Sequence, residues 1–92
     1  MQPLSESLDS IFNAIANPVR RAILARLAEG ETNVGILAEP FDMSGPAVSR
    51  HIRILRDAAL VSSERRGKKR FWRLNRETLA LAQEWLDLDR RF

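Results

Sequence analysis

The 92-residue sequence contains no cysteine and a single histidine, which removes several classes of function at once. Without cysteine the chain has no disulfide, no thiolate nucleophile and no metal site built on sulfur. The histidine, His51, follows Ser49 by two positions, and residues two apart on a helix do not face each other. With no second histidine or thiol to form a catalytic pair elsewhere, the composition argues against an enzyme.

Long apolar runs and clustered glycines are also missing. The four glycines are scattered singly, so the chain has no glycine-rich loop that could cradle a phosphate. No apolar run approaches the roughly 20 residues that span a bilayer, and the first residues lack the basic-then-apolar order of a secretion signal. We therefore expect a cytoplasmic protein. The length predicts one domain, residues 1–92, whose modest core favours association with a second copy.

Positive charge is concentrated in the middle of the chain. From Arg50 to Arg73 there are nine Lys or Arg and two acids, a net charge of +7. The whole chain carries +3, so the remaining residues carry −4. This separation suggests that one surface binds a polyanion. A solvated charged face that binds nothing is the alternative explanation.

Apolar spacing and capping residues predict four helices in the first part of the chain. The first should end before Asn17-Pro18, because proline disfavours a helical conformation in the residue before it. Asn17 then caps a second helix, which Gly30 ends. Asn33 caps a short third helix in VGILAEPF, and Ser44 caps a fourth over residues 44–58.

A basic hairpin is predicted after the fourth helix. Two strand-like runs, LVSSER and RFWRL, flank a glycine-bearing turn and form a wing over residues 62–73. Asn75 then caps a last helix. Helices joined by a short turn and followed by a basic hairpin are the order of a winged helix-turn-helix. The predicted fold is mainly α with a small β-hairpin wing, in the order α-α-α-α-β-β-α.

The last helix is apolar on two sides. Leu79, Ala82 and Leu86 form one face, and a second face lies roughly opposite. This second face consists of Leu81, Trp85 and Leu88. One face packs on its own domain, and the other most simply meets a second copy of the chain. A helix enclosed on both sides by its own domain is the alternative, and the sequence does not decide which face is which.

The N-terminal end of the fourth helix is suited to approach nucleic acid. In a helix-turn-helix the second helix enters the major groove with this end leading. Ser44 begins it, and the free N–H groups of the first turn suit a phosphate. Gly45 and Pro46 leave room for a close approach. We expect all three residues to lie against DNA.

Further along the same helix, Ser49, Arg50 and Arg53 point away from the apolar stripe formed by Val48, Ile52 and Leu55. They are the best candidates to read bases or hold phosphates. An arginine can hold guanine O6 and N7 with two hydrogen bonds, which discriminates by roughly 1–3 kcal/mol. His51 lies at the edge of the stripe, where a DNA contact and a packing role both stay open.

The turn of the hairpin supplies a second group of cations. As a wing it would lie against the DNA backbone or reach into a minor groove, while as a solvated turn it would need no partner. Two arginines near the start of the second helix, Arg20 and Arg21, are weaker phosphate candidates. The expected wing contacts are Arg66, Lys68, Lys69 and Arg70.

Two stretches of the chain resemble the ArsR/SmtB-type winged-helix bacterial regulators. They are NPVRRAIL and VGILAEPFDMSGPAVSRHIRILRDAALVSSERRGKKRFWRLN. The resemblance implies a homodimer joined through its first and last helices, with each recognition helix on half of an inverted repeat. It also implies a repressor that releases DNA when an inducer binds. The expected interface residues are Leu8, Ile11, Phe12, Ile15, Leu81, Trp85 and Leu88.

The chain departs from that family where metals are sensed. The metal-sensing branch often carries paired cysteines before the recognition helix, and VGILAEPF has none. The family's second site uses histidine on the last helix, and LALAQEWLDLDRRF has none either. We therefore expect no metal inducer and no cofactor. A different class of function, a protein-interaction module whose basic face binds an acidic partner, is the main alternative to DNA binding.

Overall fold

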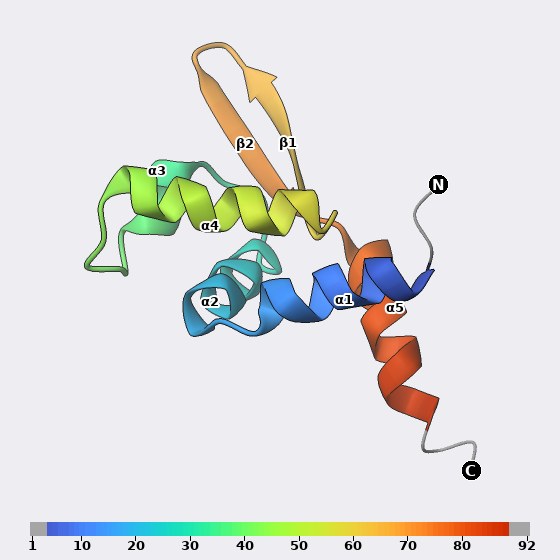
Figure 1. Ribbon diagram of the computed structural model, residues 1–92. Helices are drawn as coiled ribbons and strands as arrows, with labels where there is room; N and C mark the ends of the chain where they lie inside the picture. Colours follow the sequence, from blue (N-terminus) through green and yellow to red (C-terminus); the bar gives the residue numbers. More distant parts are fainter. Residues whose placement is uncertain (1–3, 89–92) are drawn as a thin grey trace.

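A computed structural model describes residues 4–88 of the chain (Figure 1). Within this range the order of elements is the predicted one, with a mainly helical domain and one hairpin. The helices and strands are α1 (Leu4–Ile15), α2 (Pro18–Leu27), α3 (Val34–Ala38), α4 (Gly45–Asp57), β1 (Val61–Arg66), β2 (Lys69–Leu74) and α5 (Arg76–Leu86). No helix among the described residues is long and apolar enough to cross a membrane.

Three of the predicted caps begin their helices as expected. The side chains of Asn17, Asn33 and Ser44 each accept hydrogen bonds from backbone N–H groups in the first turns of α2, α3 and α4, at 2.9 to 3.2 Å. These N–H groups have no partner within the helix, so the side chains satisfy them. The caps therefore fix where α2, the short α3 and α4 start.

Asn75 precedes α5 but does not cap it, which corrects the prediction. Its amide donates to the carbonyl of Ala59 at 2.9 Å, and its side-chain oxygen accepts from the Ser62 hydroxyl at 3.0 Å. Ala59 has a φ of +61°, because the chain turns sharply there after α4. The Asn75 side chain is used to hold this turn against the hairpin, and so it ties the start of α5 to the end of α4.

The core lies where α4 crosses the other helices, between α1 and α2 on one side and the hairpin on the other (Figure 1). The predicted apolar stripe of α4 is confirmed, since Val48, Ile52 and Leu55 are at most 1% exposed. Burying each such side chain stabilises the fold by about 1.5–3 kcal/mol. The opposite side of α4 is thereby left as the outer surface of the domain.

The hairpin is antiparallel and is anchored at its base. Its strands pair from Val61 with Leu74 to Arg66 with Lys69, and a two-residue turn joins them. Gly67 in this turn has a φ of +64°, a conformation that glycine adopts without strain. At the base, Thr32 exchanges two backbone hydrogen bonds with Trp72, at 2.7 and 3.1 Å. The segment before α3 thus joins the edge of the hairpin.

The last helix is divided along its length, and this corrects the prediction of two faces around its axis. Its first half packs on the domain, where Ala82 is 3% exposed and Leu79 and Leu81 are half-buried against the core. Its second half runs away from the domain (Figure 1). Leu86, expected on the same face as Leu79 and Ala82, is therefore exposed. The exposed apolar residues at this end are Trp85, Leu86 and Leu88.

Candidate nucleic-acid interface

The N-terminal end of α4 is open to solvent. Ser44, Gly45 and Pro46 are all exposed. A Cβ atom added to Gly45 would meet nothing within 4 Å, so the packing of the domain does not explain a glycine at this position. The N–H group of Gly45 is left without a partner within residues 4–88, whereas Pro46 has no N–H and that of Ala47 donates to the Ser44 hydroxyl at 3.2 Å. Such a helix start favours an anionic group, because its N–H dipoles point toward it.

Arg50 and Arg53 lie on the outer face of α4 and are not committed to other groups. Both side chains are exposed, and neither forms a hydrogen bond or an ion pair with any residue in the described range 4–88. Arg56, one turn further along, differs because it pairs with Asp57 at 3.1 Å. Ser49 is half-buried beside Arg50. The outer face of α4 therefore offers two unpaired guanidinium groups near its N-terminal half.

Arg20 and Arg21 do not have the position expected of phosphate ligands. Arg20 donates to the carbonyl oxygens of Ala14 at 2.6 Å and Asn13 at 3.1 Å. Arg21 donates to the carbonyl of Ile15 at 2.9 Å. These carbonyls belong to the last turn of α1, the negative end of its dipole. The two arginines therefore cap α1, and their assignment as phosphate candidates is revised.

His51 packs against Arg20 instead of standing free beside Arg50. Its Nδ1 atom lies 3.2 Å from Nη1 of Arg20. Partial burial of the ring lowers the pKa of His51 below its usual value, and the facing charges of Arg20 and Arg50 lower that pKa further. The ring is therefore neutral near pH 7.

Arg66 is the one expected wing contact, within the described residues, that is held by ion pairs. It binds the carboxylate of Glu31 with two guanidinium nitrogens and that of Glu64 at 3.0 Å. Its guanidinium also lies 5.0 Å from the centre of the Phe71 ring. These hydrogen bonds raise the pKa of Arg66 and lower that of Glu31. Arg66 therefore anchors the wing to the segment before α3.

The tip of the wing carries the cations that stay unpaired. Lys68 and Lys69 are exposed and form no ion pair or hydrogen bond through their side chains within residues 4–88. Arg70 donates to the Ser63 hydroxyl at 2.9 Å across the hairpin. The unpaired charges of the wing and of α4 thus come from two separate elements, which Figure 1 shows on the same side of α2. The role of Glu31 was not predicted, because its partner lies 35 residues away in the sequence.

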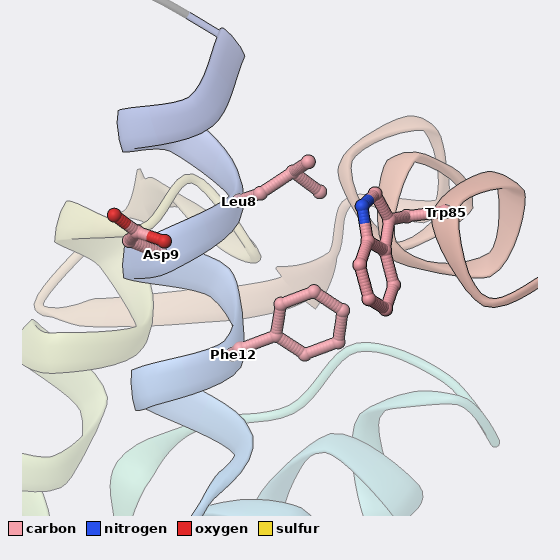
Figure 2. A pocket seen from close by; sticks show the side chains of 4 residues that line it. All are labelled: Leu8, Asp9, Phe12 and Trp85. Atoms are coloured by element: carbon pink, nitrogen blue, oxygen red, sulfur yellow. The ribbon is translucent and has the colours of Figure 1, made fainter.

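A pocket of about 400 Å³ separates α1 from the exposed half of α5. Figure 2 shows Leu8 and Phe12 of α1 pointing toward Trp85 of α5, with Asp9 on another side of α1. The rings of Phe12 and Trp85 meet edge to face, with their centres 5.8 Å apart and their planes at 72°. Most of this lining is apolar, and Trp85 is 51% exposed. The surface is incompletely covered by the chain itself.

Ile11 must be removed from the predicted dimer interface. It is 1% exposed and belongs to the core, so its side chain cannot reach a second subunit. Ile15 and Leu81 are half-buried against the same core. Neighbouring positions on α1 thus divide between core and surface, as the helical periodicity requires. Leu8, Phe12, Trp85 and Leu88 retain exposed surface.

The short helix α3 leads into α4, whose N-terminus is open, and an anchored basic hairpin follows. This arrangement defines a winged helix-turn-helix DNA-binding domain. No group of three or more potential metal ligands gathers anywhere in the described part of the chain. The comparisons with known proteins agree with this class. A helix-turn-helix domain family matches residues 15–64.

Two relatives share most of the chain. The transcriptional repressor SdpR of Bacillus subtilis is 35% identical over 79 residues, covering 86% of this chain and 88% of that protein. The HTH-type transcriptional regulator Rv2034 of Mycobacterium tuberculosis is 42% identical over 84 residues, covering 91% and 77%. The crystal structure of an ArsR family transcriptional regulator is similar with a TM-score of 0.89 and 35% identity, over 99% of this chain and 94% of that one. This chain belongs to the ArsR family of winged helix-turn-helix transcriptional regulators.

Proposed function

We propose that the chain is a cytoplasmic, homodimeric repressor that binds an inverted repeat in duplex DNA through α4 and the wing. The observation that carries this proposal is the pair of uncommitted arginines on α4. The stability of the fold does not depend on Arg50 and Arg53, because both side chains are exposed and have no partner within residues 4–88. A DNA-binding surface, by contrast, needs unpaired cations to bind phosphates and bases. SdpR, a relative of the same family, is named a transcriptional repressor.

Within the proposed complex the contacts divide by element. Ser49, Arg50 and Arg53 enter the major groove, where arginine binds guanine with two hydrogen bonds. The first turn of α4 approaches a phosphate with the N–H group of Gly45, because Pro46 has no N–H and that of Ala47 donates to the Ser44 hydroxyl. Ser44 and Pro46 lie beside this contact. The wing contributes Lys68 and Lys69 to the backbone or minor groove. Arg70 contributes after release from Ser63, and Arg66 keeps the wing in place.

The proposed dimer uses the apolar surface beside the pocket. Leu8, Phe12 and Trp85 line this pocket, and Leu88 is exposed just after α5. Ile15 and Leu81, which are half-buried against the core, complete the proposed interface with their remaining exposed area. A two-fold axis through this surface presents two copies of α4 to DNA, so that the operator has matching inverted halves. A similar structure, a winged helix-turn-helix DNA-binding domain from Mycobacterium bovis, is described as homodimeric. It has a TM-score of 0.77 and 26% identity, over 96% of this chain and 83% of that one.

Selection of bound sequences from a random duplex pool tests the proposal most directly. The expected result is one enriched sequence with inverted symmetry, bound at least about 10³-fold more tightly than scrambled DNA of the same length. Affinity should also fall steeply with salt, because lysines and arginines release counterions from the phosphates. Equal affinity for every sequence would refute the proposed function as a sequence-specific regulator. Tight binding to an acidic protein in that case would support the protein-interaction alternative.

A further inference from the structure

Arg20 joins three parts of the domain through a single side chain. Its Nε and Nη2 atoms donate to the carbonyls of Ala14 and Asn13 at the end of α1. Its Nη1 atom reaches Nδ1 of His51 on α4, 31 residues away in the sequence. Arg20 itself lies in the first turn of α2, whose start is fixed by the Asn17 cap. One planar group therefore connects α1, α2 and the recognition helix.

The chemistry of the two side chains determines where the proton of the ring lies. A guanidinium group has only donors, so Nδ1 of His51 must accept the hydrogen bond from Arg20. A neutral imidazole that accepts at one nitrogen carries its proton on the other. The Nε2–H group of His51 has no partner within residues 4–88, and it is not among the buried polar atoms that lack one. It is an available donor on α4.

We propose that Arg20 is a positioning residue for DNA binding, which holds His51 so that its Nε2–H group donates to a hydrogen-bond acceptor of the duplex. Arg20 does not touch DNA in this arrangement. It acts through the ring, and it connects the ring rigidly to the end of α1. This inference rests on the proposed DNA-binding function and adds two residues with distinct roles to it. It also decides between the two sequence-based interpretations of His51 in favour of a contact.

The surroundings of the ring support this arrangement. The charged groups that face His51 are Arg20 from α2 and Arg50 from α4 itself. Neither arginine forms an ion pair with a carboxylate in the described part of the chain. Protonated His51 would therefore stand between two cations, and its Nδ1 atom could no longer accept from Arg20. The neutral, singly oriented ring is the form that this site stabilises.

Nitrogen NMR of the side chain tests the Arg20–His51 link without DNA. The full chain without a tag contains one histidine, so one pair of ring signals reports on it. Wild type should show Nδ1 as an acceptor and Nε2 as protonated at neutral pH. Arg20→Lys keeps the charge but has one donor nitrogen, which cannot reach the α1 carbonyls and the ring together. It should shift the Nδ1 signal and the pKa of His51.

Arg21→Lys is the matched control, because Arg21 caps the same helix end through Ile15 without touching the ring. It should leave both the Nδ1 signal and the pKa of His51 unchanged. Identical ring signals and titration curves in wild type and Arg20→Lys would overturn the proposal. Thermal unfolding of both variants separates a loss of the link from a general loss of stability.

A double-mutant cycle on DNA tests whether Arg20 acts through His51. Operator affinity should fall about two- to tenfold in His51→Ala, the worth of one hydrogen bond, and by a similar factor in Arg20→Lys. The double variant should lose no more than His51→Ala alone. His51→Gln, which keeps an N–H donor at a similar reach, should recover part of the affinity. Additive losses would overturn the proposal, because they would mean that Arg20 binds DNA itself.

The two kinds of DNA acceptor are distinguished by comparing operator with scrambled DNA. A base acceptor predicts that His51→Ala weakens only operator binding, and a backbone acceptor predicts equal losses on both. Failure of the proposed function has a different signature. In that case wild type itself prefers no sequence, while the NMR signals still decide whether Arg20 orients the ring.

Discussion

Replacing Trp85 with glutamate should convert the proposed dimer into monomers. Trp85 is 51% exposed at the free end of α5, so about half of its surface is available to a partner. A tryptophan offers roughly 200 Å² in total, which leaves about 100 Å² to bury in each subunit. At about 25 cal/mol per Å², this is about 2.5 kcal/mol per subunit and about 5 kcal/mol per dimer.

Losing about 5 kcal/mol raises the dissociation constant of the dimer by about 10³- to 10⁴-fold. The charge of glutamate adds to this effect, because two carboxylates would approach each other across the two-fold axis. Sedimentation over a range of protein concentrations measures the constant directly. The substitution also removes the edge-to-face contact with Phe12, which is worth about 0.5–1.5 kcal/mol within the subunit. Circular dichroism should nevertheless show a folded protein.

Ile36→Glu provides the matched control for this experiment. Ile36 is 42% exposed on α3, away from α1 and α5. The substitution therefore introduces the same charge at a similarly exposed apolar position. Its dissociation constant should stay within about threefold of wild type, as expected for independent sites. If Trp85→Glu sediments as wild type does, the reasoning that the end of α5 is covered by a second copy is wrong.

Three other perturbations test the DNA-binding surface. Arg50→Ala should weaken operator binding by about 5- to 150-fold and binding to scrambled DNA far less. Arg56→Ala, which loses only an ion pair with Asp57, should change neither affinity much. Equal losses of affinity for both DNAs in Arg50→Ala would mean that Arg50 contacts only a phosphate. Glu31→Gln should remove the ion pair between Arg66 and the segment before α3 while leaving the pair with Glu64, and it should speed amide hydrogen exchange in the hairpin but not in α4. Unchanged exchange in the hairpin would show that the Glu31 ion pair does not anchor it. As the pH falls through the lowered pKa of His51, below its usual 6.5, Arg20 loses its acceptor. A base contact by the ring predicts that the ratio of operator to scrambled affinity then decreases, and a backbone contact predicts the same change on both DNAs. Fluorescence anisotropy between about pH 5 and 8 measures both affinities, and the same pH dependence in His51→Gln would exclude the ring as its cause.

Local features of the sequence predicted most of the fold. Asn17, Asn33 and Ser44 cap their helices because a cap needs only the three residues that follow it. The apolar stripe of α4 is likewise set by its own periodicity, and the polar surface follows from it. The hairpin is defined by a glycine turn between residues that favour strands. These elements place the recognition helix and the wing.

Features that depend on distant partners could not be predicted in the same way. Asn75 is of a residue type that caps helices, but its side-chain oxygen accepts from the Ser62 hydroxyl and its amide donates to the carbonyl of Ala59. Arg20 was a weaker candidate for a phosphate contact, and its side chain holds the end of α1. The periodicity of α5 predicted two apolar faces, but periodicity does not say where along the helix the rest of the domain ends, and both faces are buried only in its first half. Leu86 is exposed for this reason.

The residues that anchor the wing are different from the residues at its tip. The ion pairs of Arg66 and the strand pairing of Thr32 keep the base in place, while Lys68 and Lys69 support nothing else within the described chain. Substitutions at these two positions should therefore change the strength of the proposed DNA binding at little cost in stability, as for other exposed positions. For engineering, the tip is the place to randomise and Glu31 is the residue to keep.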